Sequence, residues 1–496
     1  MLTRQYVRLE GSDAPVDDEP TEPDQSWTRD STYTLSLMLL VSTLYVFSDI
    51  SRYLACLKLL SQIICQEHYL KHDDPSVASA SSSLSEDMCA VPAVQQRLAH
   101  ISGNMLSLGA ALNFIFTIPY GLMLDRLSER LVIALNVTGF VCSSAWLVVV
   151  FWFSSLFPVE AAVVAPIFSA IGGGYSVFDS VTMVIVVRHV PKKHRSLCFG
   201  FFLAAALLTQ AVSLSLTGSL LEGGYLFTPI LLNFPLGILA VLLVVMMPSG
   251  AQSIRSMTAG RALLTWPLLR QEIKSTVTAT GGLVSDPRGL GLLLVVPLAK
   301  MADPLTEVIL LYVQKRFGNS FAYASRVLTF QTMEGLVLLA GVIPLLNMLL
   351  QKRFHMPSTK VDQLITRSSF ALLGVGALVM GISQTWFLYM IGIMVFTLGW
   401  SAGPALKSVL TDMVSPHNIA ALYTLIALCD SVGTMVGPLI FNRSYALATG
   451  WADESFMGLP FLLASGLFLL GGLGTLVRGR QVSGAGEWMR ISTVSR

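Results

Sequence analysis

Charged residues are scarce in this sequence: only 12% of its 496 residues are Asp, Glu, Lys or Arg, whereas 53% are hydrophobic. In ordinary soluble domains about a quarter of the residues are charged, so the composition excludes that class. The mean hydropathy of +0.65 indicates the same. The net charge of +2 gives no indication of binding to nucleic acid. We therefore expect a protein that resides in a membrane.

Motifs of enzymes, nucleotide sites and metal sites are also scarce. The sequence has no His-Glu-x-x-His pair, and no Gly-Lys-Ser/Thr follows Gly172-Gly-Gly-Tyr-Ser176, so these glycines favour a close helix crossing over a phosphate loop. The six cysteines have no Cys-x-x-Cys or metal-ligand spacing. We expect no enzyme, no cofactor and no metal.

Apolar runs long enough to cross a bilayer recur along the chain, and about 20 residues suffice for one span. In lipid only a helix satisfies the backbone of such a run, so we predict an all-α membrane protein. The first span lies between Tyr33 and Ile64. The other eleven fall near 100–124, 131–153, 160–187, 196–220, 226–247, 289–313, 326–350, 364–382, 386–409, 419–441 and 456–477.

The twelve predicted spans form two bundles of six, the pattern left by parallel repeats in transporters. We predict an N-terminal six-helix bundle over 33–247, a cytoplasmic linker over 248–288 and a C-terminal six-helix bundle over 289–477. Residues 1–32 are acidic and proline-rich, which predicts a disordered cytoplasmic tail without a cleavable signal peptide. Residues 478–496 form a second cytoplasmic tail.

Basic residues indicate the orientation. With both termini in the cytoplasm, the inner loops, including 121–130 and 248–288, hold most of the Lys and Arg residues outside the spans, as the positive-inside bias requires. In this orientation Cys65 and Cys89 bracket the first outer loop and are a disulfide candidate. Asn442-Arg-Ser444 is then an outward-facing glycosylation candidate close to the membrane.

The turn between the second and third spans reads Gly121-Leu-Met-Leu-Asp-Arg-Leu-Ser-Glu-Arg130. It resembles the turn Gly-x-x-x-Asp-Arg-x-Gly-Arg-Arg of the major facilitator superfamily. The matching residues are Gly121, Asp125, Arg126 and Arg130, whereas Ser128 and Glu129 stand where the family usually has Gly and Arg. The resemblance implies a twelve-helix transporter with two six-helix bundles.

The resemblance also implies a conformational switch. In the family the Asp of this turn, here Asp125, engages a neighbouring helix end, and a basic residue at the inner end of the fourth span, here Arg188, takes part. The helix dipole supports this role, because it favours a carboxylate near helix N-termini. The alternative is an ordinary turn charge that faces water.

Three further stretches are similar to a fungal branch of the superfamily, related to the proton-coupled folate transporter and tetracycline-efflux groups. They are Ile64-Cys-Gln-Glu-His-Tyr69, Glu307-Val-Ile-Leu-Leu-Tyr-Val-Gln-Lys-Arg-Phe317, and Ala421-Leu-Tyr-Thr424 before Gly437-Pro438. This resemblance implies efflux of a small organic molecule, often a product of specialised metabolism.

Ionisable residues inside spans are costly and are functional candidates. Lys300, Asp303 and Glu307 follow at i, i+3 and i+7, so they share one face of the seventh span, which we expect to face a central cavity. One interpretation is a structural Lys300–Asp303 pair with Glu307 near the outer surface. The other makes Asp303 or Glu307 a proton carrier, because burial disfavours a charged carboxylate.

Other spans carry further candidates for a substrate or proton pathway. Asp49 and Arg52 are predicted to form a neutralised pair that either lines the pathway or stabilises an interface. The remaining ionisable candidates are Asp179, Glu334 and Asp430, with Lys407 ranked lower as a residue that snorkels to a helix end. Gln210 is a neutral candidate for hydrogen bonding to substrate, and Trp400, Tyr175 and Phe178 either pack in the bundle or form apolar pocket walls.

From the sequence we predict a monomeric secondary carrier in the plasma membrane that moves a small organic molecule by alternating access, coupled to protons. Its partners are the substrate, protons and the lipid bilayer. The leading interpretation is efflux. The first alternative is proton-coupled uptake of an organic anion or nutrient, suggested by Arg52 and Lys300. The second is a membrane sensor that does not transport.

Overall fold

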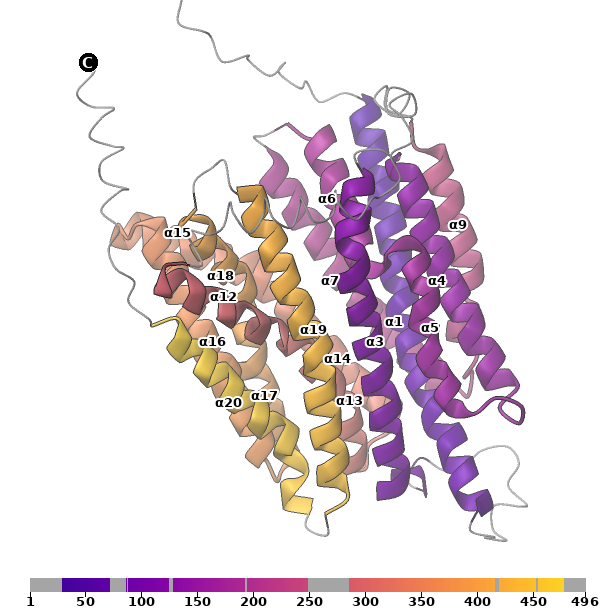
Figure 1. Cartoon of the computed structure of the whole chain (residues 1–496). Coiled ribbons are helices and arrows are strands. Elements are labelled where there is room, and N and C mark those ends of the chain that lie inside the picture. The colour runs from indigo at the N-terminus through magenta and orange to yellow at the C-terminus, as the bar shows by residue number, and fades with distance from the viewer. Residues whose placement is uncertain are drawn as a thin grey trace, which may run out of the picture.

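The computed structural model describes residues 29–71, 86, 88–124, 128–191, 194–248, 285–414, 419–451 and 454–476, and these residues are almost entirely helical. The first half contains α1 (Arg29–Lys71), α3 (Pro92–Leu124), α4 (Glu129–Trp152), α5 (Ala165–Ser169), α6 (Gly174–His189), α7 (Arg195–Glu222), α8 (Thr228–Leu231) and α9 (Asn233–Met246). The second half contains α12 (Pro287–Lys300), α13 (Ala302–Phe317), α14 (Phe321–Val337), α15 (Ile343–Phe354), α16 (Ser358–Ile382), α17 (Trp386–Leu398), α18 (Ala402–Thr411), α19 (Ile419–Thr449) and α20 (Leu459–Gly474). The two halves stand side by side in Figure 1.

Eleven helical segments of the described part of the chain are long and apolar enough to cross a membrane. Some are single long helices and others consist of short helices that follow one another directly; Phe321–Phe354, for example, joins α14 to α15 through a π-helical turn at Leu338–Val342. The seventh predicted span is present as two shorter helices, α12 and α13, so the count of twelve is close to the observed one. The all-α membrane fold is as predicted.

The break between α12 and α13 lies at Met301. Pro297 lies inside α12 and Pro304 lies in the first turn of α13, and neither residue has a backbone N–H to continue the helical ladder. α19 packs against the break so closely that a Cβ on Gly433 would lie 2.4 Å from the carbonyl oxygen of Pro297. The bend sets Lys300 and Asp303 on either side of the break.

One end of the molecule is marked by a disulfide. Cys65 near the end of α1 and Cys89 before α3 are joined, with their Cα atoms 5.2 Å apart. We call this end, at the bottom of Figure 1, the disulfide end. The helices reach further here than predicted, because α1 continues to Lys71 and α3 begins at Pro92. At its start α1 begins at Arg29, inside the predicted 1–32 tail, whose other residues lie outside the described part.

The two halves touch each other at the disulfide end. α3 packs along α19, where a Cβ on Gly103 would lie 2.8 Å from the Cβ of Asn442. α7 packs along α14, where a Cβ on Gly218 would lie 2.0 Å from Oγ of Ser325. Small residues allow such close crossings of membrane helices. Toward the opposite end α3 and α19 separate (Figure 1).

Polar contacts at the disulfide end join the same two halves. The carboxylate of Glu86, beside the disulfide, forms an ion pair with Lys58 of α1 and accepts a hydrogen bond at 2.8 Å from the backbone N–H of Phe321, the first residue of α14. Lys315 of α13 donates to the carbonyl oxygen of Ala90. Glu86 and Ala90 therefore link the first half to the second.

The Asn442 glycosylation prediction is wrong. Asn442 is only 3% exposed and lies within α19, which continues to Thr449, beyond the predicted end at 441. Its Oδ1 atom lies 3.5 Å from Ser102 Oγ of α3. The residue is part of the contact between the halves, because its polar side chain is covered by α3 and does not reach an outer loop.

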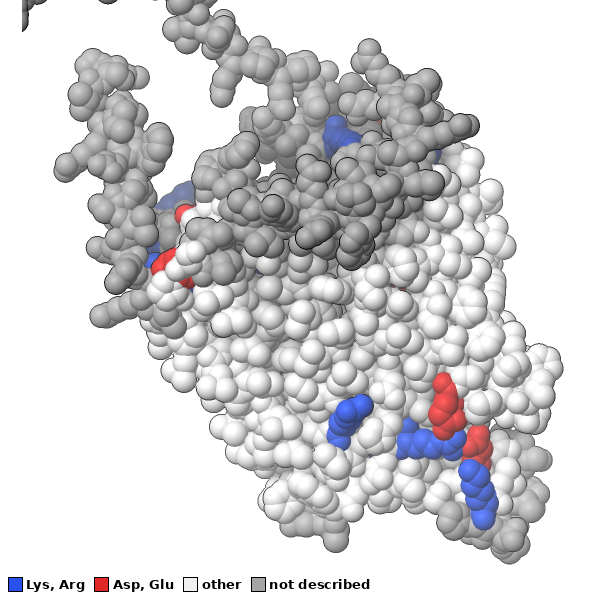
Figure 2. Space-filling view, in the orientation of Figure 1, with Lys and Arg blue, Asp and Glu red and all other residues white. Residues whose placement is uncertain are grey.

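The outer surface has the distribution expected for a chain in lipid. In the face shown in Figure 2, charged residues lie near the two ends and a broad band between them carries none. Large apolar side chains are exposed on α9 and α12, such as Val245 and Leu294, both 66% exposed. Exposed apolar residues of this kind are favourable beside hydrocarbon, whereas charges are not.

Candidate functional site

A cavity lies between the two halves and has two lobes of about 620 and 600 Å³ that share part of their lining. Cavities of this size hold small organic molecules in many proteins. The sequence-predicted residues that line it are Asp49, Arg52, Tyr175, Asp179, Gln210, Lys300, Asp303, Glu307, Trp400 and Asp430. Most of the predicted set, drawn from both halves, is thus brought together at one place.

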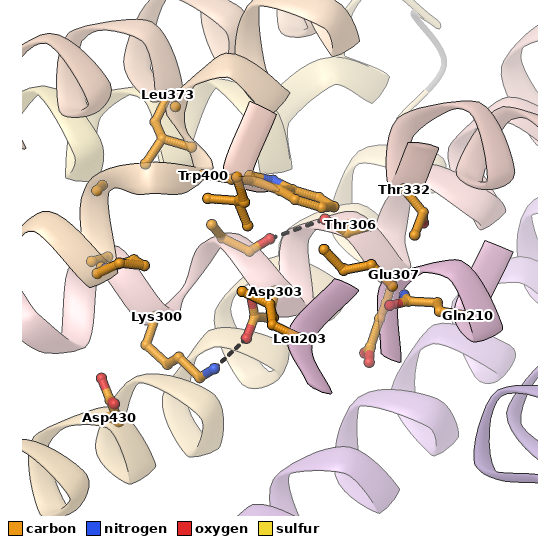
Figure 3. A pocket seen from close by; sticks show the side chains of 18 of the residues that line it. Leu203, Gln210, Lys300, Asp303, Thr306, Glu307, Thr332, Leu373, Trp400 and Asp430 are labelled. Atoms are coloured by element: carbon orange, nitrogen blue, oxygen red, sulfur yellow. Dashed lines mark hydrogen bonds and ion pairs between the residues drawn. The ribbon is translucent and has the colours of Figure 1, made fainter. Parts of the chain in front are cut away.

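Lys300, Asp303 and Glu307 face the cavity from the second half, as their helical spacing predicts. The Nζ of Lys300 lies 2.7 Å from a carboxylate oxygen of Asp303, the ion pair drawn in Figure 3. Glu307 lines both lobes together with Tyr53 of α1, so the interpretation that places Glu307 near the outer surface is wrong. Its Oε2 atom is buried and has no hydrogen-bond partner among the described residues.

Arg52 and Asp49 form the predicted neutralised pair on α1, with 2.9 Å between Nη2 and Oδ1. Arg52 also donates through Nη1 to Ser143 Oγ of α4 at 2.9 Å, and its guanidinium lies 4.4 Å from the centre of the Phe140 ring. Arg52 is therefore held on three sides by its own half. The pair lines the cavity and Arg52 also joins α1 to α4, so both interpretations of the pair stay open.

Lys407 was ranked below the other candidates because it lies near a helix end, but the structure places it in the cavity. It lines both lobes, and its Nζ lies 2.7 Å from Oδ2 of Asp430 on α19. The two residues are 23 positions apart and lie on different helices. No periodic pattern connects such residues, so only the packing of α18 against α19 reveals the pair.

Asp179 and Tyr175 face the second lobe from α6. They are four residues apart and therefore lie on the same side of that helix. α6 begins at Gly174, after a break at Gly173, where φ is +79° and a residue with a side chain would be strained. Asn136 of α4 holds this break, because its amide donates to the carbonyl oxygens of Gly172 at 2.8 Å and Gly174 at 2.7 Å.

The predicted helix crossing at these glycines is present. A Cβ on Gly172 would lie 2.0 Å from Cα of Asn136, so the two backbones touch. The sequence signal for this arrangement is a polar Asn in one apolar run and three glycines in the next. Asn136 was not among the predicted site residues, although it positions this break.

Two predicted residues lie outside the cavity lining. Glu334 of α14 lines neither lobe, although its Oε2 atom is buried and has no hydrogen-bond partner among the described residues. Phe178 is 3% exposed and stacks on Tyr45 at 4.2 Å between ring centres. Phe178 therefore packs within the first half, the more ordinary of its two predicted roles.

The structure describes some of the predicted switch residues but not all of them. Gly121 lies near the end of α3, and Asp125 and Arg126 lie outside the described residues. Arg130 lies in the first turn of α4. Arg188, at the end of α6, forms an ion pair with Glu129, the residue at which this chain departs from the usual basic turn.

The segment Gly399-Trp400-Ser401-Ala402-Gly403 matches the Gly-x-Ser-x-Gly pattern of serine hydrolases. In that class the serine is exposed on a sharp turn between a strand and a helix. Here Ser401 is 1% exposed, lies between α17 and α18, and is 2.7 Å from Ser369 Oγ. The segment therefore connects two helices and does not have the geometry of a nucleophile.

Comparisons with known proteins agree with this architecture. Residues 77–438 match the family model of the Major Facilitator Superfamily. The MFS efflux pump atnC of Emericella nidulans is 27% identical over 93% of this chain and 91% of its own length. The efflux pump ustT of Aspergillus flavus is 26% identical over 81% of this chain and 80% of its own length.

Solved structures share the fold at low sequence identity. The human organic anion transporter MFSD10 (TETRAN) is 17% identical, with a TM-score of 0.58, over 90% of this chain and 99% of its own. A D-xylose-proton symporter is 14% identical, with a TM-score of 0.60, over 91% of this chain and 98% of its own. With two helical halves, a cavity between them and a family match over most of its length, this chain belongs to the major facilitator superfamily, in a fungal branch of that family of membrane transporters.

Proposed function

We propose that this transporter exports a small organic molecule in exchange for protons, and that its two halves alternate in opening the cavity to either side of the membrane. Two fungal relatives that align with most of the chain are named efflux pumps, which supports export. The cavity between the halves supports alternating access, because its lining comes from both of them. The substrate would be a small organic molecule such as a specialised metabolite or toxin.

The observation that carries proton coupling is the environment of Glu307. One of its carboxylate oxygens is buried without a hydrogen-bond partner among the described residues. The charged groups that act on it, Asp303 and Asp49, are carboxylates already paired with Lys300 and Arg52. A buried charge without a cation is costly, so binding a proton stabilises this residue.

We further propose that the protein is a monomer in the plasma membrane. Its disulfide end would face outward, and both of its termini would lie in the cytoplasm. The distribution of basic residues supports this orientation. The observed contact of the halves then closes the outer side. Opening outward would break the contacts of Glu86 and Ala90 with the second half. The turn with Asp125, together with the Arg188–Glu129 pair, would act as the inner switch.

Transport into inside-out membrane vesicles tests this proposal and does not require the substrate to be identified in advance. Vesicles from cells that express the chain are given an extract of fungal metabolites and an imposed pH gradient, and the accumulated compounds are identified by mass spectrometry. We expect at least one compound to accumulate only when the gradient is present. Glu307→Gln should abolish the effect of the gradient, because glutamine cannot take up the proton.

Glu222→Gln is the matched control, because Glu222 is exposed at the disulfide end and pairs only with Arg326 among the described residues. It should transport like the wild type. Movement of compounds out of the inside-out vesicles would indicate uptake by the cell instead of export. The absence of any flux would support the sensor alternative. Full pH-driven transport by Glu307→Gln would exclude Glu307 as the proton carrier.

A further inference from the structure

Every cation that lines the cavity already has an acidic partner. The basic side chains in the lining are Arg52, Lys300 and Lys407. They lie 2.9, 2.7 and 2.7 Å from carboxylate oxygens of Asp49, Asp303 and Asp430, respectively. A charge that is neutralised at this distance offers little attraction to a second anion. The described part of the cavity therefore holds no unpaired positive group for an anionic substrate.

Two carboxylates remain outside these pairs. The lining contains five acidic residues and only three basic ones, and Asp179 and Glu307 form no ion pair within the described part of the chain. Glu307 is largely enclosed, whereas Asp179 is exposed to the second lobe. The cavity thus has an excess of negative charge, and Asp179 is the part of it that a bound molecule can reach.

An aromatic ring accompanies this carboxylate. Tyr175 is 48% exposed and lines both lobes on the same side of α6 as Asp179. Lys300 and Lys407 are the cations that act on Asp179 from the second half, and each is already paired. A carboxylate beside an aromatic face is the combination that binds organic ammonium groups. The walls of the other lobe are largely apolar and include Leu203 and Trp400 (Figure 3).

We propose that the substrate is an amphipathic organic cation whose positive group binds at Asp179 and Tyr175 and whose apolar part occupies the lobe beside Trp400. This inference rests on the proposed export function and specifies its substrate class. It argues against an organic anion, the first alternative suggested by the basic residues. Glu307 is left free to carry the proton, because the cation has its own carboxylate.

Two probe ions of nearly equal size and opposite charge test this assignment: tetraphenylphosphonium and tetraphenylborate. Their equilibrium binding is measured on the purified full-length protein in detergent, with the same detergent without protein as background. We expect the wild type to bind the phosphonium at least about tenfold more tightly than the borate. Asp179→Asn should weaken phosphonium binding about tenfold, and Asp179→Glu should retain most of it.

Asp362→Asn is the matched control, since Asp362 lies on α16 outside both lobes and accepts a hydrogen bond from Ser408 at 2.6 Å. It should bind the phosphonium like the wild type. Tyr175→Phe should retain binding and Tyr175→Leu should weaken it severalfold, because only the ring is needed. Equal binding of the two ions, binding of neither, or an unchanged affinity in Asp179→Asn would overturn the assignment.

The experiments distinguish a failure of the proposed proton-coupled export from a failure of the proposed cation site. If phosphonium binding depends on Asp179 but vesicles show no pH-driven accumulation, the cation site remains and proton-coupled export is excluded. If vesicles accumulate anions in a manner that depends on Glu307, export remains and the cation class is excluded.

Discussion

Removing the Glu86 carboxylate should loosen the contact between the halves at the disulfide end. Glu86 is tied to the first half by the adjacent disulfide and by its ion pair with Lys58. Its other oxygen accepts a hydrogen bond at 2.8 Å from the backbone N–H of Phe321. That N–H lies at the start of α14, where the helix dipole also favours a negative charge.

The magnitude follows from which contacts break when the halves separate. The Lys58–Glu86 pair lies within the first half and persists in both arrangements, so to a first approximation it cancels. The hydrogen bond from Phe321 is lost only on separation, and a bond to a charged group contributes about 1.5–3 kcal/mol. Glu86→Ala should therefore shift the ratio of closed to open molecules about tenfold to a hundredfold.

Spin labels on the two halves measure this ratio through the distribution of distances between them. Tyr225 and Phe387 are suitable positions, because they are 60% and 75% exposed and belong to different halves. The four free cysteines are replaced and the disulfide is kept. In the Glu86→Ala variant we expect a longer distance to gain population.

A matched control separates this effect from a general loss of charge at the interface. Glu222→Ala removes the exposed pair with Arg326, whose partners are 55% and 56% exposed. Such pairs contribute about 0–1 kcal/mol, so the shift should stay below about fivefold. A distance distribution in Glu86→Ala that matches the one in Glu222→Ala would refute the reasoning.

Two further predictions concern packing and pairing. Gly172→Ala should destabilise the protein by about 1–3 kcal/mol because its Cβ would strike Asn136, whereas Gly200→Ala has open space; equal melting temperatures would contradict this. Lys407→Met should lower thermal stability by about 1–3 kcal/mol because Asp430 is left half-buried and unpaired. Adding Asp430→Asn should restore most of the loss, and a double variant no more stable than the single one would exclude the pair as the cause.

The membrane spans could be predicted because each is a local property of an apolar run, but several helix ends could not. Asn442 was assigned to an outer loop because it follows an apolar run and is polar. In the structure Asn442 is buried against α3, and Tyr445 beyond it lies 3.4 Å from Gln95 of α3. The polar residues at these ends of α3 and α19 are buried against each other, although Gln95 and Tyr445 are 350 positions apart in the sequence. Neither segment taken alone indicates that its polar residues are buried against the other.

The candidate site likewise contains some features that could be predicted from the sequence and others that could not. The register of Lys300, Asp303 and Glu307 follows from helical periodicity, and the structure places all three in the lining. The pair of Lys407 with Asp430 depends on how α18 meets α19, so it could not be predicted from spacing. Pairing is what decides the electrostatics of the cavity. The organic-anion alternative was based on Arg52 and Lys300, yet helical spacing also suggested their pairs with Asp49 and Asp303. The structure contains both pairs and adds the pair of Lys407 with Asp430.

The positions of the three ion pairs indicate which charges of the cavity stay paired when the two halves move. Asp49–Arg52 lies on α1, Lys300–Asp303 spans the α12–α13 break, and Lys407–Asp430 joins α18 to α19. Each pair is contained in one half, so a rigid movement of the halves leaves all three intact.

The two unpaired carboxylates, by contrast, belong to different halves: Asp179 to α6 and Glu307 to α13. A movement of one half relative to the other would therefore change the distance between these two carboxylates. A bound cation at Asp179 and a proton at Glu307 both reduce the same excess of negative charge, so each weakens the attraction for the other. Reciprocal weakening of this kind is the coupling that exchange requires.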